Sequence, residues 1–255
     1  MIRVAPPPTR RFRGLWLGRR DYRTVHDWME RLFAARRAGT IGDTVLLLEH
    51  DPVITRGRGT RDGHLLASPE ALRALGVDLV ETGRGGDITL HAPGQLVCYP
   101  ILDLSPDRRD VRRYVRDLME TMRRVARELG VSGGALDPHI GLWADAASVT
   151  EWPGQERARE PLKLGAIGVR LSRWITMHGF ALNLTIDLGL FGLIVPCGIA
   201  ERGVTSVEAL TGARPEVGEA AERALHHLAE IFGATVADYR DLSGAALTTA
   251  EQAVA

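Results

Sequence analysis

Apolar residues recur along this chain with two different spacings, and each spacing predicts one kind of element. In residues 21–37 and 107–129 the apolar side chains lie three and four positions apart, which predicts two amphipathic helices. Asp21 stands where it can cap the first of these helices. Ser68-Pro69 predicts the start of a short helix that ends near Gly76. Two more helices are predicted over residues 206–210 and 215–232.

Short apolar runs between these helices predict strands. A short apolar segment at 14–18 precedes the first helix, and the predicted strands cover residues 44–49, 77–81, 84–91, 95–104, 139–143, 162–170 and 175–184. The segments 84–91 and 95–104 flank Pro93-Gly94, so we expect them to pair as a hairpin. A long, highly charged loop, residues 144–161, joins two of the later strands.

Helices and strands interleave without an internal repeat or a break in composition, which favours one mixed α/β (α+β) domain. We place this domain at residues 13–240. Residues 1–12 are rich in proline and arginine and predict a flexible N-terminal arm. Residues 241–255 predict a frayed C-terminal tail.

Composition narrows the class of protein. The chain is 45% hydrophobic and 25% charged, with no net charge, so nothing in its overall charge favours nucleic acid or membrane binding. No apolar stretch approaches the ~18 residues of a membrane span, and the N-terminus lacks the apolar core of a secretory signal. Two cysteines, Cys98 and Cys197, suit a reducing compartment, and we expect a cytoplasmic protein.

The basic residues of this chain are arginines, with one exception. Lys163 is the only lysine, against 31 arginines, and it lies in an apolar, glycine-containing run. Arginine stays protonated in proteins, whereas a desolvated lysine can lose its proton near neutral pH. Lys163 is therefore a candidate for a titrating amine, although a chance survivor in an arginine-rich sequence is the alternative.

Cys197 follows an apolar segment within Pro196-Cys197-Gly198. Such a turn can expose a thiol and bring backbone N–H groups close to a developing oxyanion. The alternative is a small buried residue before a turn, which is common for cysteine and is our interpretation of Cys98. A neighbouring cation lowers the pKa of a thiol, so a pairing of Cys197 with Lys163 would give a nucleophile and a proton donor.

Residues 84–95 pack glycine and alanine around polar side chains, with Arg84 and His91 as flanking donors. The backbone of such a segment can approach a ligand closely, although a plain glycine-rich turn explains it equally well. The histidines and cysteines show no zinc-site spacing, so no metal site is predicted. We interpret the many arginines of the 107–129 helix as a solvated helix face rather than a dock for an acidic partner.

Three motifs in this order resemble the bacterial octanoyltransferases of lipoate biosynthesis, in the biotin and lipoate ligase superfamily. The resemblance covers roughly residues 14–232 and rests on Arg84-Gly85-Gly86 through His91 with Pro93-Gly94-Gln95, on Lys163 through Arg170 with Thr176 through Asn183, and on Pro196-Cys197-Gly198-Ile199. It implies a mixed β-sheet with helices packed outside it. It also implies the first step of endogenous protein lipoylation: transfer of octanoyl from a thioester on acyl carrier protein to a lysine of a lipoyl domain, in 2-oxoacid dehydrogenases or the glycine cleavage H protein.

The resemblance further implies roles for individual residues. Cys197 would carry the acyl group as an S-acyl intermediate, with Lys163 as its acid/base partner, and no cofactor would be needed. The acyl-binding cleft would be lined by the segment 84–91 and two later strands, namely Arg84, Gly85, Gly86, Asp87, Ile88, Thr89, Leu90, His91, Ala166, Ile167, Gly168, Gly179, Phe180 and Ala181.

Two features depart from the family pattern. Leu90 and Ala92 stand where the family has a tyrosine and a glycine, which bears on the width of the cleft. The loop 144–161 is longer than usual, which suggests a mobile segment or an added docking surface. The rival hypotheses are an ATP-dependent lipoate or biotin ligase, and a non-catalytic module that binds acyl chains or lipoyl domains.

Overall fold

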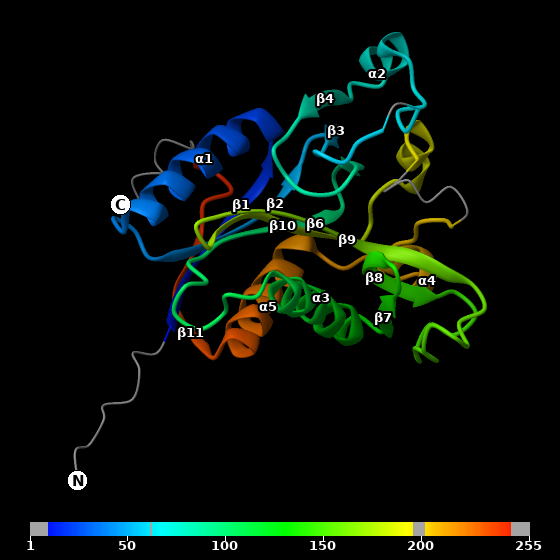
Figure 1. The fold of residues 1–255 in the computed structure, drawn as a ribbon. Coiled ribbons are helices and arrows are strands. Elements are labelled where there is room, and N and C mark those ends of the chain that lie inside the picture. The colour runs from blue at the N-terminus through cyan, green and yellow to red at the C-terminus, as the bar shows by residue number, and fades with distance from the viewer. Residues whose placement is uncertain (1–9, 62, 196–201, 246–255) are drawn as a thin grey trace.

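The computed structural model describes residues 10–61, 63–195 and 202–245, and they form a mixed α/β arrangement of two sheets (Figure 1). The large sheet has eight strands in the order β11-β1-β2-β6-β10-β9-β8-β7. Their bounds in chain order are β1 Arg10–Arg20, β2 Asp43–His50, β6 Gln95–Ile101, β7 Gly133–Leu136, β8 His139–Asp145, β9 Pro161–Ser172, β10 Ile175–Asn183 and β11 Ala234–Asp241. β1 is parallel to both β2 and β11, and the other neighbours are antiparallel.

A small sheet stands at one end of the large one. It contains β3 Val53–Arg56, β4 Asp78–Glu81 and β5 Ile88–His91 in the order β4-β3-β5, with the short helix α2 Pro69–Ala74 beside it (Figure 1). The predicted hairpin of 84–91 with 95–104 is therefore wrong, because β5 and β6 belong to different sheets. Gly94, at φ 85°, makes the turn between them, and the Leu184 and Thr185 N–H groups donate to its carbonyl. The Gly94 carbonyl is therefore already used and does not contribute to pairing between β5 and β6.

Helices cover both faces of the large sheet (Figure 1). On one face lies α1 Tyr22–Ala38, which buries the apolar stripe predicted for it, Val25, Trp28, Met29, Leu32 and Phe33. On the other face α3 Val111–Glu128 and α5 Val217–Phe232 pack together over a second core. The 3-10 helix η1 Leu188–Leu193 and the short α4 Val207–Thr211 complete the fold.

The caps of α1 and α3 follow from their sequences. The Asp21 carboxylate accepts from the Thr24 N–H at 2.9 Å, and α1 ends at Gly39 in the left-handed conformation. α3 begins later than its predicted start at 107, because the Asp110 carboxylate caps it by accepting from the Arg113 N–H at 3.0 Å. Val111, predicted in the buried stripe of this helix, is 43% exposed.

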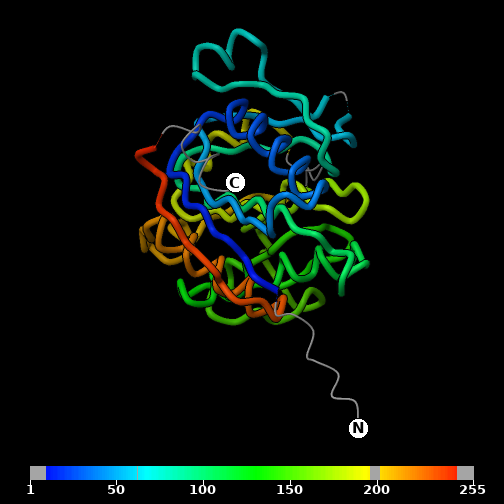
Figure 2. Tube along the Cα trace, turned by 90° about the vertical axis from the view of Figure 1, so that its left-hand side faces the viewer, coloured from blue at the N-terminus to red at the C-terminus, as the bar shows by residue number. Residues whose placement is uncertain are grey.

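Both predicted chain ends require correction where the structure describes them. β1 starts at Arg10, inside the arm predicted for 1–12, and Phe12 is fully buried. β1 lies beside β11, a strand that the sequence pattern did not reveal (Figure 2). The Arg20 guanidinium donates to the carbonyls of Leu242, Ser243 and Ala245, so the start of the predicted tail is held in place. Residues 1–9 and 246–255 lie outside the described part.

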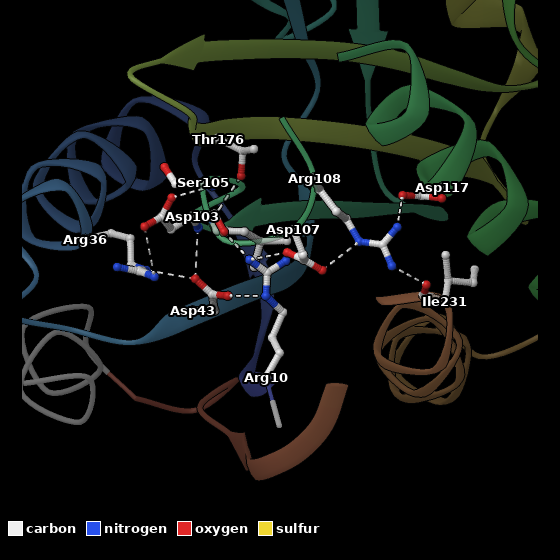
Figure 3. Close-up of polar contacts among 11 residues, drawn as sticks. Arg10, Arg36, Asp43, Asp103, Ser105, Asp107, Arg108, Asp117, Thr176 and Ile231 are labelled. Carbon is white, nitrogen blue, oxygen red and sulfur yellow. Dashed lines mark hydrogen bonds and ion pairs between the residues drawn. The ribbon is translucent and has the colours of Figure 1, made fainter. Parts of the chain in front are cut away.

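Buried ion pairs join β1, α1 and the segment before α3 (Figure 3). The Asp43 carboxylate contacts the Arg10 guanidinium at 3.2 Å and the Arg36 guanidinium at 2.8 Å. Arg108, buried before α3, contacts Asp117 at 2.9 Å and donates to the Ile231 carbonyl at 2.6 Å. These contacts tie the N-terminal strand to both helical layers. Among the described helices, none is long and apolar enough to cross a membrane.

Candidate active site

Small residues on β9 and β10 form the floor of a cleft on the α1 face of the large sheet. Ala166 pairs with Ala181 and Gly168 with Gly179, so no large side chain fills the space above these two strands. The resulting cavity is narrow, with a volume of about 40 Å³. We call it the inner cleft, and its other walls are Tyr22, Arg84, Gly86, Asp87, Thr89, His91, Tyr99, Ile167, His178 and Phe180.

Histidines in and around the inner cleft are kept neutral by burial. Burial lowers the pKa of His50 to about 4, against a smaller opposing effect of its hydrogen bond to the Arg20 carbonyl. Burial, and then the neighbouring His50, lower the pKa of His91 to about 3. The pKa of His178 also lies well below its usual value, chiefly through burial. Near neutral pH the imidazoles of this cleft therefore carry no charge.

Hydrogen bonds fix the tautomers of two of these rings. His50 donates from Nδ1 to the Arg20 carbonyl at 3.0 Å, which leaves its Nε2 to accept from the Tyr99 hydroxyl at 2.9 Å. His91 donates from Nδ1 to Gln95 Oε1 at 2.7 Å. These bonds hold the polar wall of the inner cleft rigid.

Arg84 supplies a buried positive charge beside these neutral rings. Its side chain is fastened to β3, because its guanidinium donates to the Thr55 carbonyl at 2.7 Å and to the Thr55 hydroxyl at 2.9 Å. Only 7% of Arg84 is exposed. The cation is thus held in one place in the wall of the inner cleft.

A wider cleft continues from the inner one across Gly86, Asp87, Ile167 and Gly168, which line both. This outer cleft has a volume of about 630 Å³, and Lys163 is one of the residues that line it. Its other walls come from the loop after β3, the start of α3 and β8, and they include Arg61, His64, Val111, Val115, His139 and Ile140. His64 and Asp87 form a close polar pair at its edge, with Nδ1 to Oδ2 at 2.5 Å.

The Lys163 side chain is confined by its neighbours on β8. It is only 6% exposed, and its Nζ lies 5.7 Å from the centre of the Trp143 ring. Gly141, at φ 141°, passes so close that a Cβ there would lie 2.9 Å from Lys163 Cε and 2.5 Å from the Gly165 carbonyl oxygen. Gly141 is therefore required both for the backbone conformation and for the path of the lysine.

Cys197 lies outside the described residues, but the chain on both sides of it is anchored at the outer cleft. Before it, the Val195 N–H donates to the His64 carbonyl at 2.8 Å. After it, the Lys163 N–H donates to the Gly203 carbonyl at 3.0 Å, and the Thr205 N–H donates to the Lys163 carbonyl at 2.9 Å. The segment that contains Cys197 thus leaves from and returns to residues that line this cleft.

Most of the residues expected to line a cleft do so, and two do not. Gly85 lines the outer cleft, and Arg84, Gly86, Asp87, Thr89, His91, Ala166, Ile167, Gly168, Gly179, Phe180 and Ala181 line the inner one. The expectation for Ile88 and Leu90 is wrong: β5 alternates, so both point away from the cleft into a separate apolar core and are fully buried. Ala92 belongs to the same core. Leu90 and Ala92, the two residues that differ from the family pattern in this segment, therefore both lie outside the cleft wall.

Several wall residues were missed by sequence reasoning, notably Tyr22, His64, Tyr99 and His178. His178 has a positive φ of 60°, a conformation that sequence does not reveal. Tyr99 alternates with Cys98 on β6, and this period of two could have placed it on the α1 face of the sheet, opposite Cys98. Among the described residues, no group of three or more histidine, cysteine, aspartate or glutamate side chains could hold a metal ion.

The long charged loop is tied at its base. Both carboxylate oxygens of Asp145 are used: the Glu160 N–H donates to Oδ1 at 2.9 Å and the Arg159 N–H to Oδ2 at 3.1 Å. Gly134 lies directly beneath the Trp152 indole, where a Cβ would be 2.4 Å from Nε1. The loop is therefore packed against β7 rather than against either cleft.

Comparison with known proteins assigns the fold and the family. The solved bipartite lipoate protein ligase of Thermoplasma acidophilum superposes with a TM-score of 0.68 at 13% identity, over 96% of this chain and 90% of that one, which shows a shared fold. Octanoyltransferases of Chloroflexus aggregans and Solibacter usitatus are each 44% identical, over 85% and 92% of this chain and 92% and 96% of their own lengths. The family model for the lipoyl protein ligase A/B catalytic domain matches residues 21–229. This chain belongs to the lipoyl protein ligase A/B catalytic domain family.

Proposed function

We propose that this protein is an acyltransferase that moves an octanoyl group from a thioester on acyl carrier protein to a lysine of a lipoyl domain. Its transient acyl carrier is Cys197, and its acid/base group is Lys163. The names of its relatives support octanoyl transfer. The observation that carries the assignment of these two residues is the anchoring of the Cys197 segment on the Lys163 backbone and on His64 at the outer cleft.

The two clefts have different roles in this proposal. The inner cleft, with its floor of alanine and glycine and its uncharged rings, accommodates the apolar acyl chain. The thioester carbonyl then lies where the inner cleft meets the outer one, near Gly86 and Gly168. Lys163 faces this carbonyl from the outer side.

In the first half-reaction the Cys197 thiolate attacks the thioester carbonyl, and a new C–S bond forms. The tetrahedral intermediate collapses by breaking the C–S bond to the pantetheine thiol. The Lys163 ammonium donates its proton to this leaving sulfur, which departs as a neutral thiol. The products are S-octanoyl-Cys197 and a neutral lysine.

In the second half-reaction the amine of the acceptor lysine attacks the S-octanoyl carbonyl. Neutral Lys163 accepts the proton that the attacking amine must lose, and an amide bond forms as the C–S bond to Cys197 breaks. The thiolate and the ammonium are thereby restored. Arginine in place of Lys163 cannot take up this proton, because its pKa lies above about 12.

The test is an intact-mass measurement after incubation with octanoyl-loaded carrier protein and without ATP. We expect a mass increase of one octanoyl group, located on Cys197 by peptide mapping and released by an acceptor lipoyl domain. Cys197→Ser should abolish the adduct. Cys98→Ala is the matched control and should retain it, since Cys98 is fully buried and burial raises the pKa of its thiol. Transfer that requires ATP and a free acid would replace the proposal with a ligase.

A further inference from the structure

The arginines of α3 fall into two groups. Arg123 and Arg124 both contact Glu120, at 2.6 and 2.9 Å, and Arg108 just before the helix is buried against Asp117 (Figure 3). Four others near the start of the helix are exposed and form no salt bridge within the part of the chain that the structure describes: Arg109, Arg112, Arg113 and Arg116. These four arginines are exposed, as predicted for a solvated helix face, and no carboxylate of the described residues lies within salt-bridge distance of them.

These unpaired arginines adjoin an exposed apolar groove. Arg112 and Arg116 line it together with Val115 of α3. The groove has a volume of about 570 Å³, and two of its apolar residues are strongly exposed, Val111 by 43% and Ile140 by 59%. Exposed apolar surface rimmed by charge is typical of an interaction site.

The groove leads directly to Lys163. Val111, Val115, His139, Ile140 and Ile167 line both the groove and the outer cleft. A ligand that enters along α3 therefore reaches the site of acyl transfer without crossing another element. We call the surface formed by Val111, Arg112, Val115, Arg116 and Ile140 the α3 groove.

We propose that the α3 groove is the docking surface for the acyl-donor carrier protein, an inference that rests on the proposed function. The pantetheine arm of such a donor is joined to its carrier through a negatively charged phosphodiester. Guanidinium groups match phosphate oxygens in bidentate geometry, and Arg112 and Arg116, one helical turn apart, present two of them at the mouth of the groove. The apolar floor accepts the uncharged part of the arm.

Charge also selects the donor over the acceptor. The acceptor brings a lysine side chain that is cationic in solution, and four unpaired arginines repel it. The same arginines attract a phosphodiester and any acidic side chains around it, which accelerates encounter and weakens with salt.

The experiment compares Arg112→Glu/Arg116→Glu with a charge-matched control, Arg37→Glu/Arg127→Glu, at two exposed positions on α1 and α3. Binding of pantetheine-bearing carrier protein is measured by titration, and transfer is measured with octanoyl-carrier protein and with octanoyl-pantetheine, which has neither phosphate nor carrier. We expect the groove variant to bind the carrier at least tenfold more weakly and to show a similarly raised KM, with less than a twofold change for octanoyl-pantetheine. The control should match the wild type.

Equal carrier binding by groove variant and wild type would overturn the proposal, and so would a selective loss of lipoyl-domain binding. The binding arm is independent of catalysis. If the wild-type protein bound the carrier through this groove but formed no octanoyl adduct, the proposed function would fail while the docking surface stood. Circular dichroism and melting temperature establish that both double variants are folded.

Discussion

The inner and outer clefts share part of their walls, but the polar side chains of the two clefts lie in different surroundings. In the inner cleft burial holds His91 and His178 neutral, and hydrogen bonds lock His50 and His91 into single tautomers. In the outer cleft Lys163 and the His64–Asp87 pair face a much larger open volume. The neutral rings of the inner cleft suit an alkyl chain, and the Arg84 cation in its wall is held in hydrogen bonds to Thr55. The outer cleft contains the amine to which we assign proton transfer.

The boundary between the clefts lies at four residues, Gly86, Asp87, Ile167 and Gly168. Gly168 is closely approached: a Cβ there would lie 3.1 Å from the Gly85 carbonyl oxygen. The segment that contains Gly85, just before β5, can therefore contact β9 only because both residues at the contact are glycines. In the proposed reaction, a thioester carbonyl at this boundary has its alkyl chain on one side and its reacting atoms on the other.

The largest expected effect removes Lys163, the proposed acid/base group, from the outer cleft. Lys163→Met and Lys163→Arg should each lower the rate of octanoyl transfer by about 10³-fold, the usual contribution of a positioned acid/base group. The guanidinium preserves the charge but cannot accept the amine proton. Steady-state transfer and the rate of S-acylation are measured separately. An arginine variant with wild-type activity would remove the proton-transfer role of Lys163.

The next effect comes from moving the same amine without removing it. Gly141→Ala places a methyl group 2.9 Å from Lys163 Cε, so the side chain must shift, and we expect transfer to fall about 10²-fold. Gly154→Ala is the control, because Gly154 also has a positive φ, 87°, but has nothing within 4 Å of an added Cβ. A similar loss in both variants would point to backbone strain rather than lysine placement.

A change in the inner cleft should alter which chain is accepted rather than the chemistry. Ala166→Leu fills the floor, and overpacking by about 1–3 kcal/mol corresponds to an about 5- to 150-fold lower kcat/KM for octanoyl thioester. A butyryl thioester, which does not reach as far, should lose less than threefold. Ala34→Leu, at an exposed position on α1, is the control. Equal losses for the two acyl donors would place the chain elsewhere.

Sequence reasoning worked where local pattern and structure coincide. Asp21 and the apolar spacing of α1 contain enough information for both the start and the buried face of that helix. The glycine and alanine residues around Ile167 and Phe180 stood out because the motifs that contain them are specific. Lys163 was conspicuous through composition alone.

The predictions that failed concern features that are set by tertiary pairing. β11 is a charged strand whose residues are mostly half-buried or exposed, and it exists because β1 offers it an edge. β5 and β6 are adjacent in sequence but do not pair with each other. Between them the chain turns at Gly94, whose carbonyl accepts from the N–H group of Thr185, a residue far away in the sequence. Likewise Ile88 and Leu90 belong to the right motif, but only the strand's orientation shows which side chains face the cleft.

The smallest expected effect concerns stability and tests the neutral character of the inner cleft. In the folded protein His50 and His91 have pKa values of about 4 and about 3, whereas in the unfolded chain they should titrate near the usual value of about 6.5. Between about pH 4 and 6.5 the unfolded state therefore binds protons that the folded state does not. The free energy of unfolding should fall as the pH falls through this window, by up to about 1.4 kcal/mol per pH unit for each histidine.

Urea denaturation at pH 7.5, 6 and 5 measures this slope. The stability should be nearly flat above about pH 7, because both states then hold these rings neutral. His50→Gln should reduce the slope by about one histidine's contribution, although it also lowers stability at pH 7.5 by disturbing the bonds to Arg20 and Tyr99. His226→Gln, at an exposed site on α5, should leave the slope unchanged. A wild-type slope equal to that of the His50 variant would mean that His50 is charged or solvated in the folded protein, and the contrast between the two clefts would then rest on shape alone.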